Sequence, residues 1–186
     1  MVAEVPVKGV FEENCYFFID DRTKHGFVID PGAQGEGLLR LIRKEGWTIE
    51  KILLTHGHFD HIWGLDALRD AANAAAESDG LEDVKAYAAE EERDLLKNPH
   101  LNVSDQGGRP CVTYADVYVK DGQEITIAGM TCKAIHTPGH TSGGCCYYFD
   151  FILFYPCVWR IASQAGSHEK GRASGFRSFG IDQWNC

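Results

Sequence analysis

The stretch Thr55-His56-Gly57-His58-Phe59-Asp60-His61 places three imidazoles and one carboxylate within six positions. Neutral imidazole and carboxylate are the side chains that bind zinc or iron at neutral pH. The apolar run Lys51–Leu54 before this stretch is typical of a buried strand, and the Ala- and Leu-rich segment Ile62–Ala76 after it is typical of a helix. The cluster therefore lies on a loop that leaves the carboxyl end of a strand, where sheet-based enzymes place their chemistry. We predict a metal site on this loop.

A second histidine-bearing turn follows in His136-Thr137-Pro138-Gly139-His140-Thr141-Ser142-Gly143-Gly144. Proline and glycine form turns, and the residues Met130–Ile135 before them have the pattern of a strand. His136 stands at the end of that strand, whereas His140 is presented on the turn itself. We therefore favour His140 over His136 as a metal ligand that faces the first cluster.

With these motifs the chain resembles the metallo-β-lactamase superfamily, in its glyoxalase II-like hydrolase branch. The resemblance extends from the N-terminus to about Phe154, and the His-x-His-x-Asp-His motif is far more specific for the superfamily than for the branch. The segments that carry it are Asn14-Cys15-Tyr16, Val28-Ile29-Asp30-Pro31-Gly32, Thr55–His61 and His136–Thr141. In the second segment the resemblance implies that Asp30 is a structural carboxylate behind the site, which orients the ligands.

The resemblance also implies a site for one or two metal ions. His56, His58 and His140 would hold the first ion, and Asp60 and His61 would face the second. Asp60 would in addition be the catalytic residue, because a carboxylate beside the attacking water can orient it or take its proton.

The chemistry of these residues favours hydrolysis. Three neutral imidazoles with one open position form a catalytic zinc arrangement rather than a closed structural one. Zinc lowers the pKa of its bound water to about 7 and so supplies hydroxide at neutral pH. No Ser-His-Asp or Cys-His nucleophile pattern competes in the sequence. We expect one or two zinc ions, with iron or manganese as alternatives.

The family pattern breaks after Phe154. In the family this strand leads into a Gly-Asp turn whose aspartate bridges the two metals, but here it is followed by Tyr-Pro-Cys-Val-Trp. Cys157 stands at about the place of the missing carboxylate, and its substitution as a thiolate ligand is an open alternative. His168 has the wrong surroundings for the last histidine of the family, and we do not assign it.

We therefore divide the chain into a metallo-β-lactamase-like domain, residues 1–154, and a divergent tail, residues 155–186. The tail is rich in Gly, Ser and Arg and shows neither a period of two nor one of 3.6 residues. A shift of composition at the point where the motif fails indicates an aberrant or truncated C-terminus. A displaced reading frame is our hypothesis for it.

For the fold we expect the α/β class, as the αβ/βα four-layer sandwich that the resemblance implies, with its second half incomplete. The strands expected in the first sheet are Val5–Val10, Tyr16–Ile19, Gly26–Ile29 and Lys51–Leu54, and Val84–Ala88 is a further strand. Those expected in the second sheet are Val117–Val119, Glu124–Ile127, Met130–Ile135, Cys145–Phe149 and Phe151–Phe154. The expected helices are Leu38–Lys44, Ile62–Ala76 and Glu90–Lys97.

Composition narrows the setting of the protein. With 186 residues, 44% of them hydrophobic, the chain can bury the core of one domain. It has no apolar run of about 18 residues and no leader-like segment, so neither membrane insertion nor secretion is indicated. The seven cysteines form no disulfide framework, which favours a cytoplasmic location. The net charge of −9 argues against nucleic acid and for a small-molecule substrate, while the oligomeric state is left open.

Three interpretations of the function follow. The one we favour is an enzyme, a glyoxalase II-like metallo-hydrolase that uses zinc-bound hydroxide on a thioester or ester of a small molecule. The second is a truncated, catalytically impaired homologue that binds metal, since the bridging aspartate and the last histidine are missing. The third is a mononuclear iron dioxygenase that acts on glutathione persulfide, although that branch also depends on the missing carboxylate.

Overall fold

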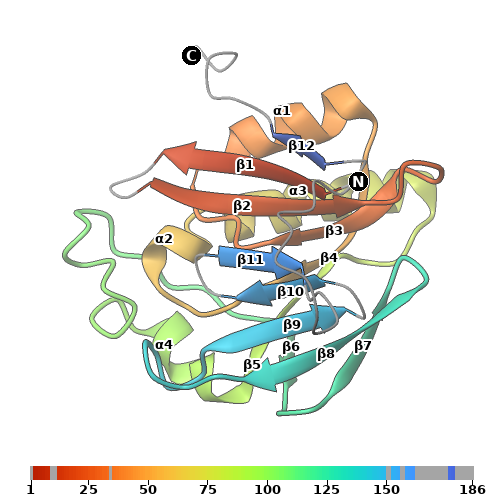
Figure 1. The fold of residues 1–186 in the computed structure, drawn as a ribbon. Helices are drawn as coiled ribbons and strands as arrows, with labels where there is room; N and C mark the ends of the chain where they lie inside the picture. Colours follow the sequence, from red (N-terminus) through yellow and green to blue (C-terminus); the bar gives the residue numbers. More distant parts are fainter. Residues whose placement is uncertain are drawn as a thin grey trace.

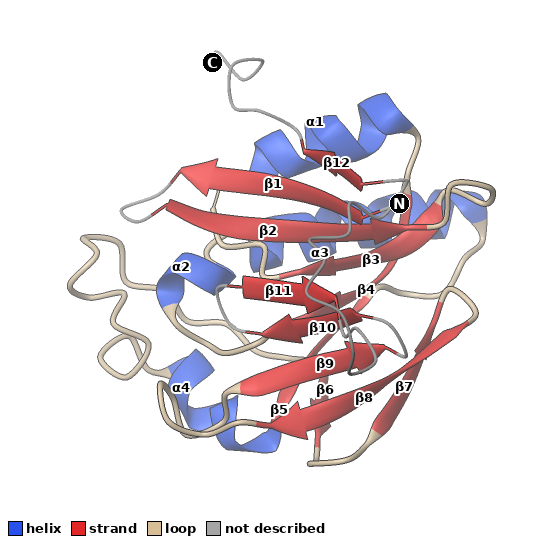
Figure 2. Cartoon of the chain, viewed as in Figure 1, coloured by secondary structure: helices blue, strands red, loops and turns tan. Residues whose placement is uncertain are grey.

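The computed structural model describes residues 2–8, 12–33, 35–149, 152–155, 158–161 and 176–178. Its strands form two sheets, and the described helices all come before the second sheet in the sequence (Figures 1 and 2). The helices are α1 (Gly35–Glu45), α2 (Phe59–Ile62), α3 (Leu65–Asp79), the one-turn 3-10 helix η1 (Glu90–Glu92) and α4 (Arg93–Lys97).

The first sheet has the strand order β12-β1-β2-β3-β4-β5-β6. Its strands are β1 (Val2–Lys8), β2 (Glu12–Ile19), β3 (His25–Ile29), β4 (Thr48–Leu53), β5 (Lys85–Ala89), β6 (Val117–Val119) and β12 (Phe176–Ser178). The pairs β1–β2 and β2–β3 are antiparallel, whereas β3, β4, β5 and β6 run parallel. Parallel strands present their carboxyl ends at one edge of the sheet, and the loop after β4 therefore opens at that edge.

The second sheet is antiparallel throughout, with the order β11-β10-β9-β8-β7. Its strands are β7 (Glu124–Ile127), β8 (Met130–His136), β9 (Cys145–Phe149), β10 (Ile152–Tyr155) and β11 (Val158–Ile161). The turn between β8 and β9 brings its residues to the same edge of the molecule as the loop after β4, because the Cys145 N–H donates to Thr55 O at 2.8 Å.

The first sheet is buried on both faces because its apolar residues are consecutive along the strands. Phe17 of β2 belongs to a core shared with α1 and α3, for example with Leu38 and Leu65. The neighbouring Phe18 points to the other face and stacks on Phe149 of the second sheet with ring centroids 5.9 Å apart. Burial of each such ring contributes about 1.5–3 kcal/mol to stability. Helices, first sheet and second sheet therefore form successive layers.

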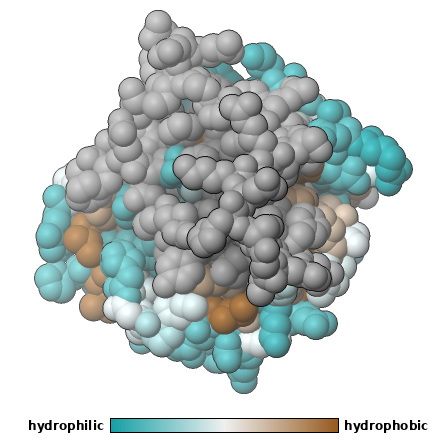
Figure 3. Space-filling model, in the orientation of Figure 1, coloured by the Kyte–Doolittle hydropathy of each residue, from teal (hydrophilic) through white to brown (hydrophobic). Residues whose placement is uncertain are grey.

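Strand β8 of the second sheet buries one face only. Along β8 the buried Cys132 and Ala134 alternate with the exposed Thr131 and Lys133. No described helix follows β6, so within the described residues the second half lacks an outer helical layer. In the view of Figure 3 the described surface is mainly hydrophilic, with small separate hydrophobic patches. The mixed α/β fold with an incomplete second half was predicted correctly.

The structure corrects the sequence prediction for Val117–Val119. This segment is β6 of the first sheet, paired in parallel with β5 from Tyr87–Val117 to Ala89–Val119, and not the first strand of the second sheet. The sequence of a three-residue strand does not indicate which strand it pairs with. The long connection between α4 and β6 allows β6 to run parallel to β5, in the direction that β3 to β5 share.

Three further differences concern single elements. The expected helix Glu90–Lys97 is divided into η1 and α4, and the motif residues Phe59–Ile62 form the separate helix α2. In the tail, where we found no strand pattern, β11 extends the second sheet and β12 pairs with β1. Cys157 and His168 lie outside the described residues.

Candidate metal centre

The predicted motif is divided between a loop and a helix. His56 and His58 lie on the loop after β4, while Asp60 and His61 lie in α2. Gly32 of the Asp-Pro-Gly turn packs so closely that an added Cβ would lie 1.5 Å from Asp60 O. The Gly64 N–H donates to Pro31 O at 2.8 Å, so the same turn also supports the end of α2. The backbone around the motif is thus held by the turn that follows β3.

Three histidines meet at this edge of the molecule. His56, His58 and His140 each offer a ring nitrogen, and these three atoms lie within 4.8 Å of one another. His58 Nδ1 and His140 Nε2 are 3.0 Å apart although the residues are 82 positions apart in sequence. The ring centroids of His56 lie 4.9 Å from those of both other histidines. The structure therefore brings together the three residues that we predicted as ligands of a first metal.

His56 carries the feature that is typical of a metal ligand. It is buried, with 1% of its surface exposed, and its Nε2 has no hydrogen-bond partner among the described residues. A buried polar atom without a partner costs about 1–3 kcal/mol, and native proteins rarely contain one without a reason. Nitrogen of this kind is what a zinc ion accepts as ligand, so the residues present fit a metal.

Thr55 determines which nitrogen of His56 is available. The Thr55 hydroxyl donates to Asp30 Oδ2 at 2.5 Å, so its lone pair is left to accept a hydrogen from His56 Nδ1 at 3.2 Å. Asp30 Oδ1 also accepts the Thr55 N–H at 2.8 Å. This chain fixes the tautomer that keeps the hydrogen on Nδ1 and leaves Nε2 as a bare acceptor. Asp30 is thus the carboxylate behind the site that the sequence predicted, with Thr55 as an intermediary that it missed.

The surroundings of His56 and His58 favour the neutral form of both imidazoles. Burial, followed by repulsion from His61, His58 and His140, lowers the pKa of His56 to about 2. Burial and the nearby His140 also lower the pKa of His58, although Asp60 opposes the shift. Imidazole binds metal only in its neutral form, so both shifts favour metal binding at neutral pH.

Asp60 and His61 lie beside the three histidines without joining their group. The His61 ring centroid is 4.1 Å from that of His56, and its Nε2 is 3.9 Å from Asp60 Oδ2. His61 Nδ1 is 3.0 Å from Asp30 Oδ2, which directs Nε2 away from Asp30. Their role as ligands of a second metal stays a prediction.

His136 has a different task from the one we weighed for it. Its Nε2 lies 2.8 Å from Ser142 O and donates to it, and its backbone N–H donates to Asp121 Oδ1 at 2.9 Å. His136 thereby holds the two ends of the turn together and lies outside the group of three histidines, which includes His140 instead.

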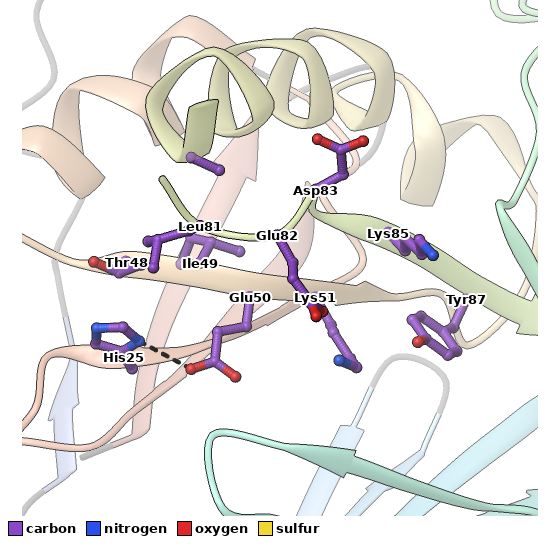
Figure 4. Close-up of a pocket in the computed structure, with 11 residues that line it drawn as sticks. His25, Thr48, Ile49, Glu50, Lys51, Leu81, Glu82, Asp83, Lys85 and Tyr87 are labelled. Carbon is purple, nitrogen blue, oxygen red and sulfur yellow. Dashed lines mark hydrogen bonds and ion pairs between the residues drawn. The ribbon is translucent and has the colours of Figure 1, made fainter. Parts of the chain in front are cut away.

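A second polar hollow of about 270 Å³ lies at the opposite end of the parallel strands (Figure 4). His25 and Thr48, which begin β3 and β4, belong to its lining. His25 Nδ1 is hydrogen-bonded to Glu50 Oε1 at 2.9 Å, and the lining also includes Lys51, Lys85, Glu82 and Asp83. This hollow is separate from the histidine cluster and offers charges of both signs.

Comparison with known proteins shows the family of the chain. The sequence model of the Metallo-beta-lactamase superfamily matches residues 9–151, and the chain therefore belongs to the metallo-β-lactamase superfamily. It is 32% identical over 142 residues to the probable metallo-hydrolase YqgX of Bacillus subtilis (strain 168). It is 30% identical over 149 residues to the hydroxyacylglutathione hydrolase of Enterobacter sp. (strain 638). The crystal structure of BLEG-1, a B3 metallo-beta-lactamase, superposes with a TM-score of 0.70 at 34% identity.

The chain is shorter than these relatives. The matches span 75% of this chain and 62% of YqgX, and 77% of this chain and 46% of the Enterobacter enzyme. The BLEG-1 superposition covers 80% of this chain and 67% of that structure. Among the described residues, no helix has the length and apolar character needed to cross a membrane.

Proposed function

We propose that this chain is a metallo-hydrolase that cleaves a thioester or ester of a small molecule with one or two bound metal ions, zinc foremost. The observation that carries the proposal is the convergence of three imidazole nitrogens within 4.8 Å, one of them the buried and unpaired His56 Nε2. Three imidazoles with an open fourth position are the ligand set of catalytic rather than structural zinc.

In this proposal His56, His58 and His140 hold the first ion. A bound zinc ion supplies Lewis acidity, which lowers the pKa of a coordinated water from 15.7 to about 7. The protein supplies the rest of the arrangement. Burial keeps the His56 imidazole neutral, and the Asp30–Thr55 chain directs its Nε2 to the ion. Iron and manganese are the alternatives to zinc, because imidazole and carboxylate also suit them.

Asp60 is the residue that we propose for proton transfer. It lies two positions after His58 in the first turn of α2, and it is partly exposed. Its carboxylate would orient the attacking water and accept its proton at an Oδ atom. Together with His61 it would also receive a second ion, for which the 3.9 Å between Asp60 Oδ2 and His61 Nε2 is support.

A thioester is the substrate class that we favour. The Enterobacter relative is a hydroxyacylglutathione hydrolase, and the Bacillus relative is a probable metallo-hydrolase. The net charge of −9 supports a small-molecule substrate over nucleic acid. The five described cysteines are free thiols, which is support for a reducing, cytoplasmic location.

The test is elemental analysis of the purified chain together with hydrolysis of a hydroxyacylglutathione thioester. Zinc near one or two ions per chain with turnover is the expected result. Bound metal without turnover would favour the catalytically impaired homologue, whose specific support is that only three of the five predicted ligands group together. Bound iron with oxygen uptake on glutathione persulfide would favour the dioxygenase. A chain that binds no metal would contradict all three.

A further inference from the structure

We propose that Glu92 is a positioning residue, which holds the two histidine-bearing loops at the separation that metal binding requires. The expected effect on metal binding rests on the proposed metal site. The hydrogen bonds of Glu92 to the two loops are present without a metal ion. Glu92 ends the short helix η1, and neither the motif nor the turn contains it. The sequence predicts a helix over Glu90–Lys97 and indicates no role for Glu92 within it.

The Glu92 side chain joins the two loops directly. The residue is fully buried, with 0% of its surface exposed. Its Oε2 accepts the Gly57 N–H at 2.7 Å, and its Oε1 accepts the Gly143 N–H at 2.7 Å. Gly57 separates His56 from His58, and Gly143 follows His140 by three residues. One carboxylate thus binds the backbone of both ligand loops.

The two glycines show how closely the loops approach this carboxylate. A Cβ on Gly143 would lie 2.7 Å from both Glu92 Oε1 and the Glu92 backbone nitrogen. A Cβ on Gly57 would lie 3.0 Å from Glu92 Oε2 and 2.7 Å from Leu95 Cδ2. Real Cβ atoms essentially never come within 3.0 Å, so a larger residue at position 143 would push its loop away from the Glu92 backbone, while one at position 57 would require Leu95 and the Glu92 carboxylate to shift. The glycines of the two motifs therefore serve the same contact.

Glu92 acts through the loops rather than on the metal. Of the described residues, only His56, His58 and His140 form the candidate ligand group. Each oxygen of Glu92 receives an N–H from a loop, and a buried N–H needs such an acceptor. Only a carboxylate offers two acceptor oxygens in this geometry, whereas an amide offers one acceptor and an NH2 group that would face a donor. The neighbouring Glu91 side chain is exposed.

The first arm of the test measures zinc affinity by competition with a chromophoric chelator. We expect Glu92→Gln to weaken zinc binding by about 10–100-fold, the loss typical when a group that orients metal ligands is changed. Glu91→Gln removes the same charge one residue away and should leave the affinity unchanged. Arg69→Gln removes a buried ion pair with Asp66 and Asp116 elsewhere, and should lower the unfolding midpoint without weakening zinc binding in the folded protein. Unchanged affinity in Glu92→Gln would overturn the proposal.

The second arm needs no metal. Amide hydrogen exchange, followed by NMR in the presence of a chelator, should accelerate at Gly57 and Gly143 in Glu92→Gln, by about tenfold or more at the glycine that faces the NH2 group and loses its acceptor. Amides in the strands, such as that of Val28, should keep their wild-type rates. If the wild type binds no zinc but the exchange at these amides accelerates, the proposed metal site is wrong and the positioning role of Glu92 is supported. If the exchange at Gly57 and Gly143 is unchanged, the positioning role of Glu92 is wrong, whether or not the protein binds zinc. Should Glu92→Gln not fold, the shorter Glu92→Asp gives the same two measurements.

Discussion

The two ends of the parallel strands both collect polar side chains, yet they differ in how those side chains are paired. At the end where the strands begin, His25 is bonded to Glu50 Oε1, and Glu50 Oε2 accepts the Ala128 N–H at 2.8 Å. Both side chains there are about one-third exposed. At the carboxyl end His56 is buried with an unpaired Nε2, and its pKa is lowered to about 2. A histidine whose ring nitrogen is hydrogen-bonded to a neighbouring residue stabilises the fold. A buried histidine with an unpaired ring nitrogen is instead a candidate metal ligand.

The largest expected effect is on zinc affinity, which a substitution at the carboxyl end should lower and a substitution at the opposite end should not. His140→Ala removes an exposed residue that we propose as a ligand, and it should weaken zinc binding by more than about 100-fold, beyond the loss for a residue that only orients ligands, and abolish turnover. Because His140 is exposed, the fold should persist. His25→Ala at the opposite end is the matched control and should bind zinc as the wild type does. Equal affinity in both variants, measured by chelator competition, would remove the distinction between the ends.

A second experiment tests Thr55, which links Asp30 to the proposed ligand His56. Thr55→Val keeps the side-chain shape but deprives Asp30 Oδ2 and His56 Nδ1 of their shared hydroxyl. We expect a loss of about 1–3 kcal/mol in the free energy of unfolding and zinc affinity about tenfold lower. Thr48→Val, in the hollow at the other end, should change stability by less than about 0.5 kcal/mol. Urea unfolding and zinc titration measure both quantities in the two variants. Equal losses of stability and zinc affinity in Thr55→Val and Thr48→Val would contradict the role of Thr55 in fixing the His56 tautomer.

The pH dependence of stability should report on the buried His56 at the carboxyl end. Unfolded His56 has a pKa of about 6.5, so below that pH the unfolded state takes up a proton that the folded state, with its pKa of about 2, refuses. The metal-free protein should therefore lose about 1 kcal/mol of stability per pH unit as the pH falls below about 6.5, and none of this loss applies above that pH. Urea midpoints at pH 7 and 5.5 measure it. His56→Gln should flatten the slope, and the exposed His100→Gln should not.

The smallest effect is expected at the well-paired end. Glu50→Gln weakens a hydrogen bond whose His25 and Glu50 side chains are 36% and 32% exposed, so the loss in the free energy of unfolding should stay below about 1 kcal/mol. Zinc affinity should not change. A larger loss, or weaker zinc binding, would mean that this end communicates with the histidine cluster, which the separation of the two ends along β4 argues against.

Much of the fold could be predicted from periodicity and motif. The strands Glu124–Ile127 and Cys145–Phe149 have the predicted bounds, because turn residues delimit them. The partner of Val117–Val119 could not be predicted, since three residues do not specify a sheet. The strands β11 and β12 also escaped prediction, because their sequences are short and lack alternation that continues beyond them.

For the candidate site, the residue types and their spacing predicted the three histidines that meet, and a turn predicted that His140 rather than His136 joins them. The supporting contacts were beyond reach. Thr55 begins the motif but had no predicted role, and its bridge to Asp30 requires the pairing of β3 with β4. Glu92 stands among three consecutive glutamates of which it alone is buried, a distinction that only the packing of η1 against the two loops creates.

The 82 positions between His58 and His140 have a consequence for the order of folding. Strands β1 to β4 can pair through short connections, whereas His140 arrives only when the second sheet docks and a long loop closes. A chain that has formed the first sheet alone presents two of the three imidazoles. If the chain binds metal as proposed, metal uptake during refolding should follow the docking of the second sheet and therefore come later than the appearance of strand structure.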